Sequence, residues 1–464
     1  MSGLLWILPA LALGCLFVHH WLSLLRPRWL SILLLFGAGT PAGIGITSCL
    51  FYLSVVAAPR IQNLSMWIEM ALLGGLAYAA FRKRQPPAAH LPALRFPLNA
   101  LLIGSLLIAA VAVTTIISGA WEANPHGNWD AWTLWNLRAR FLAAGGELAQ
   151  RAWSPMLASH PEYPLLVSAF VGRCWAYGQD ASTAVPIATS YLYLLSLLAL
   201  MIGGIGLLRS QSLGLLAGLA LLGTPTLLHE VPAQYADVPI TCYFAGAIVL
   251  MLLDYPLLAG LCASMAAWTK DEGLLFLVLL CAAATAFRRR DVPRLIMGAL
   301  PVTFIFLGFK ALLHAGTPSI LGNSVLGLVP KLEDPSRYGQ VIGAFGSEFV
   351  GMASGWYHPL LPVLVLAIVL RFDRERHRDL LFCATVAGSL MLAYFATYII
   401  TPYDLTWHLQ SSLDRIFVQL WPCLLLAVFA GLRRPEALAR VAIQPTAEAT
   451  PDKIRKKKKT PGRR

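Results

Sequence analysis

Long apolar stretches separated by short polar segments run from one end of the chain to the other. Most are about 16 to 25 residues long, enough to cross a bilayer core roughly 30 Å thick. The pattern predicts an all-α, polytopic bundle of about 13 transmembrane helices. They are expected near residues 4–25, 29–57, 64–81, 98–119, 184–208, 211–228, 238–254, 256–269, 273–287, 294–313, 356–371, 379–400 and 416–432.

The segments between these helices define the expected organisation. Residues 1–97 form an N-terminal group of helices, and residues 98–432 form the main membrane domain. External loops are expected in this domain, the first containing interfacial amphipathic helices; they cover about 120–183, 229–238, 314–345 and 401–415. Residues 433–464 are predicted to be a basic, disordered cytoplasmic tail.

Composition and charge agree with a membrane protein. The chain is 57% hydrophobic and 13% charged, with a formal net charge of +13. Residues 452–464 hold eight Lys or Arg and one Asp, which supplies +7, and most other basic clusters flank apolar stretches. This distribution follows the positive-inside rule, so the basic loops are expected in the cytoplasm of a multi-pass inner (plasma) membrane protein. Nucleic acid is not an expected partner; the tail is expected to touch anionic lipid headgroups.

Two further features narrow the class. The N-terminus lacks the basic region of a signal peptide, so the first apolar stretch is predicted to be a retained helix. The eight cysteines are scattered and form no C-x-x-C pair, which supports neither a disulfide framework nor a cysteine metal site.

The first chemically dense segment, Asn128–Arg140, reads NWDAWTLWNLRAR and follows the fourth expected helix. Asp130 is either a helix N-cap, for which Asp is well suited, or a base held near the lipid headgroups. Trp129, Arg138 and Arg140 are candidates for substrate contacts. A helical wheel gives this segment two apolar faces flanked by arginines, which predicts a helix lying in the membrane interface. One face holds Leu134, Leu137 and Phe141, and the other holds Trp132, Trp135 and Leu142.

A second cluster, HEVPAQYADVP, joins two expected helices on the same outer side. Asp237 precedes a Val-Pro pair and suits a helix start. However, His229, Glu230, Tyr235 and Asp237 crowd one short loop, and capping needs one of them. Asp237 is therefore a catalytic candidate and Tyr235 a candidate for substrate binding.

The third cluster, WTKDEG, lies between two short apolar stretches, which indicates either partial crossings or a helix break at a cavity. Intramembrane charges cost roughly 2.5–3.5 kcal/mol each and usually mark a site. Lys270 either snorkels to the interface or binds a phosphate as a point charge, and Asp271 is a possible cap. Lys270 is taken as a substrate-binding candidate and Glu272 as a catalytic one.

Weaker signals complete the set. In the last external loop, His408 and Arg415 are positioned to reach a cavity. The prolines of HPEYP, residues 160–164, shape a turn. Glu69, alone in an apolar stretch, is expected to bond a neighbouring helix. The histidines lack metal-ligand spacing, so no cofactor is predicted, and a divalent metal is left open.

Three of these motifs resemble membrane glycosyltransferases of the C-type fold, a superfamily that includes protein O-mannosyltransferases and the lipid A aminoarabinose transferase. They are GNWDAW (Gly127–Trp132), QYADVP (Gln234–Pro239) and AWTKDEGL (Ala267–Leu274), and the similarity covers about residues 120–290. The resemblance implies that Asp130 is the base and that Lys270 borders the pocket for a lipid phosphate.

Two departures from the family pattern are visible. The loop follows a fourth helix rather than the first, which three extra N-terminal helices explain. Ala131 follows Asp130 where many relatives have a second acid. Whether Glu122 or Glu162 supplies the second acid for Asp130 is left open.

The resemblance predicts an inverting transfer of a hexosyl or pentosyl unit from a polyprenyl-phosphate carrier to a glycan, lipid or protein acceptor on the outer face of the membrane. Such a reaction needs a base for the acceptor hydroxyl and stabilisation of the departing phosphate. The alternatives are a lipid-linked glycan polymerase or ligase, and a transporter or flippase of lipid-linked substrates. The transferase interpretation requires Asp130, Asp237 and Lys270 to line one site.

Overall fold

The computed structural model describes residues 2–22, 27–58, 61, 63–82, 100–154, 160–313, 325–352 and 359–436. Within these ranges the regular structure is helical, apart from one isolated antiparallel bridge between Phe372 and Leu432. The prediction of an all-α protein is therefore confirmed. The predicted tail lies outside the described residues from position 437 onward.

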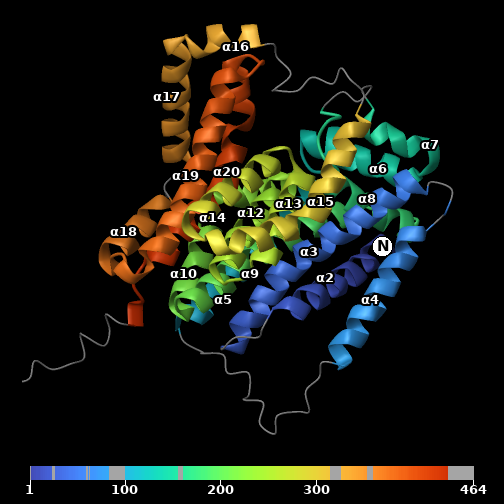
Figure 1. Cartoon of the computed structure of the whole chain (residues 1–464), viewed down its shortest axis with the longest axis horizontal. Helices are drawn as coiled ribbons and strands as arrows, with labels where there is room; N and C mark the ends of the chain where they lie inside the picture. The colour runs from blue at the N-terminus through green and yellow to red at the C-terminus, as the bar shows by residue number, and fades with distance from the viewer. Residues whose placement is uncertain are drawn as a thin grey trace, which may run out of the picture.

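The N-terminal half begins with four long apolar helices. Short helices and turns follow, and α8 and α9 then enter the bundle (Figure 1). The helices are α1 (Ser2–Leu5), α2 (Ile7–Trp21), α3 (Arg28–Ala57), α4 (Leu64–Arg82), α5 (Ala100–Ser118), α6 (Asn136–Ala144), α7 (Gly146–Ala149), α8 (Leu166–Gly178) and α9 (Ala184–Leu208), with π-helical turns η1 (Gly119–Ala123) and η2 (Ala131–Trp135) and the 3-10 turn η3 (Gln150–Trp153).

The C-terminal half continues with α10 (Gln211–Leu222), α11 (Pro225–Ala233), α12 (Asp237–Leu252), α13 (Pro256–Thr269), α14 (Glu272–Phe287), α15 (Val292–Leu312), α16 (Val325–Leu332), α17 (Pro335–Gly351), α18 (Leu360–Leu370), α19 (His377–Ile400) and α20 (Leu405–Gly431). Figure 1 shows α16 across the end of α17, and α17 beside α19 and α20.

Among the described residues, eight helices are long and apolar enough to cross a membrane. The count rises to nine if α10 and α11, which meet at a 65° bend, form one broken span. Four shorter apolar helices, α12, α13, α14 and α18, accompany them. The chain is a multi-pass helical membrane protein, and the count of 13 crossings stays a prediction.

Three segments that were expected to be external loops are largely helical. Residues 229–233 belong to α11, residues 325–351 to α16 and α17, and residues 405–415 to the first turns of α20. These segments contain enough polar residues to be predicted as loops, but packing against neighbouring helices stabilises them as helices. Residues 314–324 lie outside the described part of the chain.

The two apolar faces predicted from the wheel are not kept in the structure, and the interfacial position stays a prediction. Residues 131–135 form a π-helical turn before α6, so positions do not advance by 100° per residue. Trp132 is 48% exposed, whereas Trp135 on the same predicted face is buried, and Arg138 is fully buried. Leu134, on the other predicted face, is buried as well, so the segment packs into the protein on both predicted faces.

The segment formed by η2 and α6 is held in place by its packing against α8. α8 is buried over most of its length and packs against α6 and α3. Its Arg173 donates through Nε to both carboxylate oxygens of Glu69, at 2.8 and 2.9 Å, and both side chains are excluded from solvent. The expectation that Glu69 bonds a neighbouring helix is confirmed.

Charged residues of several inter-helix turns meet at one end of the bundle. Arg209 pairs with Asp373 at 2.8 Å, and Arg288 pairs with Asp254 at 2.8 Å and with Asp379 at 3.1 Å. The basic clusters that flank different apolar stretches therefore lie together. The polar segments described next lie at the opposite ends of the helices.

Candidate functional site

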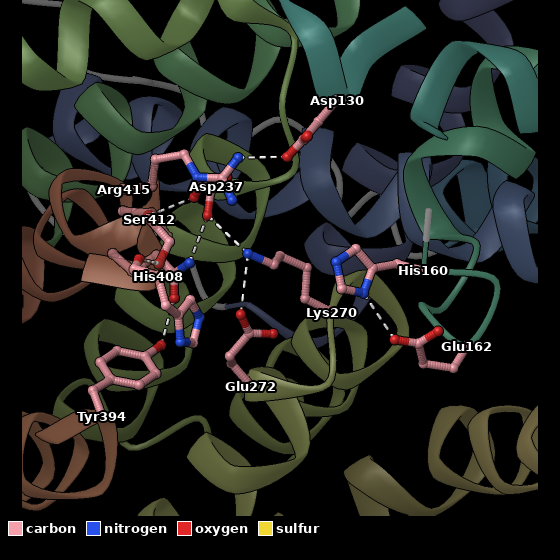
Figure 2. Close-up of polar contacts among 12 residues, drawn as sticks. Asp130, His160, Glu162, Asp237, Lys270, Glu272, Tyr394, His408, Ser412 and Arg415 are labelled. Atoms are coloured by element: carbon pink, nitrogen blue, oxygen red, sulfur yellow. Dashed lines mark hydrogen bonds and ion pairs between the residues drawn. The ribbon is translucent and has the colours of Figure 1, made fainter. Parts of the chain in front are cut away.

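One network of ion pairs joins the three principal clusters (Figure 2). Asp130 comes from the turn before η2, Asp237 begins α12, and Lys270 and Glu272 flank the break between α13 and α14. Arg415, on α20, completes it. Segments separated by 285 residues in the chain thus converge at one place.

Asp237 is the centre of the network. Its Oδ1 accepts from Lys270 Nζ at 3.0 Å and from Gln419 Nε2 at 2.6 Å. Its Oδ2 lies 3.9 Å from Arg415 Nε, which is too long for a hydrogen bond. The Asp237 side chain is only 3% exposed, so the surrounding cations and amide replace water.

Asp130 is held by Arg415 and not by a helix cap. Asp130 occupies the N-cap position of η2, yet its carboxylate makes no capping bond, and Oδ2 accepts from Arg415 at 2.5 Å. Asp237 and Asp271 also start helices without capping them. Capping therefore does not account for these acids.

Lys270 does not snorkel to the surface. Its side chain is 5% exposed, and Nζ contacts Glu272 Oε1 at 3.1 Å in addition to Asp237. Burial alone would lower the pKa of Lys270, but the charges of Asp237 and Glu272 raise it above the usual value. The ammonium therefore lies enclosed between two carboxylates.

Two glycines allow the chain to adopt this arrangement. A Cβ on Gly273 would lie 2.0 Å from the carbonyl carbon of Ala266, so only glycine permits the tight break after Lys270. Gly127 has a φ of +72°, and a Cβ there would lie 2.6 Å from Ala131 and from the Ala233 carbonyl oxygen. Gly127 thereby brings the Asp130 turn against the end of α11.

Two of the substrate-binding candidates border the network. The Arg415 guanidinium lies 5.0 Å from the centre of the Tyr235 ring. His408, two turns before Arg415 on α20, contacts Thr401 Oγ1 through Nδ1 at 2.8 Å. Figure 2 shows His408 on the same side of Asp237 as Tyr394.

Three other candidates have no ion pair or hydrogen bond to this network in the described structure. Arg138 is fully buried and donates to the carbonyl oxygens of Ala152, Pro161 and Tyr163, so its role is structural; burial lowers its pKa to about 9. Arg140 lies in a separate small cavity. Trp129 is 63% exposed and contacts Trp132.

Neither Glu122 nor Glu162, the two acids left open as partners of Asp130, forms an ion pair or a hydrogen bond with it in the described structure. Glu162 instead bonds His160 at 2.9 Å, beyond Lys270 in Figure 2. Asp237 is the acid linked to Asp130, through Arg415.

Several residues near the network did not stand out in the sequence. Gln419 connects Asp237 to the Tyr394 hydroxyl, and a lone amide in an apolar stretch was the available signal. Glu230, in α11, is 9% exposed, and its Oε2 has no hydrogen-bond partner in the described structure. The Tyr163 ring lies 6.0 Å from Lys270 Nζ.

The charge balance limits what the site does chemically. Asp130, Asp237 and Glu272 supply three negative charges, and Lys270 and Arg415 supply two positive ones. Both cations are already paired, although Arg415 Nε has no hydrogen-bond partner in the described structure, so an incoming phosphate competes with the carboxylates for these cations. Asp130 and Glu272 are 28% and 24% exposed and form the accessible edge. In the described part, no group of three or more His, Cys, Asp or Glu could hold a metal ion.

Comparisons with models of protein families, with curated proteins and with solved structures gave no match. The function must therefore be argued from the site alone.

Proposed function

We propose that the protein is an integral membrane glycosyltransferase that uses a polyprenyl-phosphate sugar as donor. The observation that carries this proposal is the bridge formed by Arg415 between Asp130 and Asp237, with Lys270 on the far side of Asp237. The transferase interpretation required these acids and this lysine to lie together. Neither Asp130 nor Asp237 makes a capping hydrogen bond at its helix start, which supports a chemical role for both.

In the proposed reaction, the donor phosphate displaces Asp130 from Arg415. Arg415 presents a planar set of N–H donors suited to phosphate oxygens, and Lys270 adds a point charge. The freed Asp130 carboxylate accepts the proton of the acceptor hydroxyl. The acceptor oxygen then bonds to the anomeric carbon as the bond from that carbon to the phosphate oxygen breaks, and polyprenyl phosphate leaves.

This scheme has one stereochemical and one electrostatic consequence. A single displacement inverts the anomeric centre. Asp237 is too enclosed by cations to act as a base, so it holds Lys270 and Arg415 in place, and Glu272 holds Lys270 from the other side. We place the site on the outer face of the plasma membrane, opposite the basic turns, in keeping with the positive-inside rule.

The test replaces Asp130 by Asn in the host cell and analyses both surface glycans and lipid extracts. We expect one glycan modification to be lost and a polyprenyl-phosphate sugar to accumulate, with the variant inserted at normal abundance. Glu122→Gln is the matched control, because Glu122 is an exposed acid of the same outer segment. Normal glycans in the Asp130→Asn cells would reject the proposal.

A transporter of lipid-linked substrates is the second candidate, favoured by the 65° bend between α10 and α11. Broken helices near charged residues are common in transporters. Proteoliposomes distinguish the two functions: a transporter moves the labelled lipid across the bilayer without an acceptor, whereas a transferase consumes it only when an acceptor is present.

A further inference from the structure

A small cavity lies beside the Asp130 turn and apart from the ionic network. Its volume is about 70 Å³, and its lining includes His126, Trp132, Asn136, Arg140, Trp175 and Thr183. One water needs about 10–15 Å³ of such space, so the cavity has room for a compact group of several atoms but not for a glycan.

Arg140 is the charged group of this cavity. Its guanidinium lies over the Trp175 ring, 5.3 Å from the ring centre, which is a cation–π distance. It forms neither a hydrogen bond nor an ion pair with any part of the chain that the structure describes, and it is exposed. Its N–H donors are therefore available to an anion.

The lining of the cavity adds positive potential and holds no acidic side chain. Thr183 is the N-cap residue of α9, a 25-residue helix whose first turn carries the positive end of the helix dipole. None of the lining residues is acidic. This differs from the Asp237 network, where carboxylates already occupy both cations.

The neighbouring aromatic residues indicate the depth of the cavity in the membrane. Trp132 lines it and is 48% exposed, and its partner Trp129 is 63% exposed. Exposed tryptophans concentrate at the headgroup level of a bilayer, where phosphate groups are abundant.

We infer that this cavity binds a phosphate group, with Arg140 as its principal ligand. The phosphate comes either from a membrane phospholipid at the headgroup level or from a free phosphate in the aqueous phase. A planar guanidinium above an indole, at a helix N-terminus, suits the oxygens of either. The inference stands apart from the transferase proposal, since its readout is binding and not sugar transfer.

The test uses the full chain purified in a neutral detergent. Phosphatidylglycerol and diacylglycerol, which lacks a phosphate, are titrated separately, and retained lipid is counted by native mass spectrometry; radiolabelled inorganic phosphate is the third probe. We expect Arg140→Gln to weaken phosphatidylglycerol binding about tenfold or more, the effect of losing a charged hydrogen-bonding group. Arg151→Gln is the matched control, an exposed arginine on η3 that does not line the cavity.

Each outcome decides the inference. Arg140-dependent binding of phosphatidylglycerol supports a lipid source, and Arg140-dependent binding of inorganic phosphate alone supports a free source. Equal binding of both phosphate probes by wild type and Arg140→Gln overturns the inference, as does diacylglycerol binding as tightly as phosphatidylglycerol. Arg140→Lys keeps the charge without the planar donors and is expected to fall between wild type and Arg140→Gln.

Discussion

Replacing Lys270 by Met tests the central network most directly. Lys270 Nζ lies 3.0 Å from Asp237 and 3.1 Å from Glu272. At an effective dielectric of about 20, a charge pair at that distance attracts by about 5.5 kcal/mol, much of which desolvation offsets. Removing one partner of a buried pair costs about 3–5 kcal/mol, because the other charge stays buried. Lys270→Met is expected to lower the free energy of unfolding by that amount.

Equilibrium unfolding in mixed detergent micelles measures this loss. The double variant Lys270→Met, Asp237→Asn removes both buried charges and should recover about 2–3 kcal/mol of it, as coupling between contacting residues requires. Lys331→Met is the control, since within the described residues Lys331 bonds only the Thr401 carbonyl and its loss should cost about 1 kcal/mol. The reasoning fails if Lys270→Met is as stable as wild type, or if the two substitutions are additive.

Three further predictions concern the neighbourhood of the site. Arg138→Met should destabilise the protein by about 2–3 kcal/mol, because three backbone carbonyls lose their donor; limited proteolysis should cut residues 136–163 sooner. Glu230→Gln should leave the free energy of unfolding unchanged or raise it, since burying a carboxylate without a cation is costly; a clear loss in micelle unfolding would contradict this. Burial raises the pKa of Glu162, but the hydrogen bond from His160 and the charge of Lys310 bring it below the usual value of 4.5. Ionised Glu162 therefore adds stability above pH about 4.5, and this stability is lost as the pH falls through the lowered pKa. Hydrogen exchange around Glu162 should report this loss, and His160→Gln should reduce it, with the contribution of Lys310 remaining.

Helix positions were largely predictable from apolar periodicity. α9 and α13 begin and end at the expected residues, and α3 and α14 begin within one residue of them. These helices are bounded by polar residues, prolines or glycines that hydropathy registers directly. The same pattern misplaced the start of α20, because its first turns carry His408 and Arg415 on a helix that faces the site rather than lipid.

The composition of the site was partly predictable. Asp130, Asp237, Lys270, Glu272 and Arg415 were each visible as charges next to apolar helices. Their connectivity was not visible, since Arg415 reaches Asp130 across 285 residues. Arg138 and Arg140 lie two residues apart on α6 and so face opposite sides of it, but the sequence did not show that the Arg138 side is buried, because the π-helical turn before α6 shifts the faces expected from the wheel.

The position of the network's partners along the chain also sets an order of assembly during synthesis. Lys270 follows Asp237 by 33 residues, and Gln419 follows it by 182. At about 5–20 residues per second, Lys270 emerges about 2–7 s after Asp237, and Gln419 about 9–36 s after it. The nascent protein therefore neutralises its buried acid first with the hairpin of α12 and α13, and ribosomes that stall before α20 leave Asp237 paired with Lys270 but without Arg415 and Gln419. Such arrested chains should be preferred substrates for membrane proteases that recognise exposed intramembrane charge.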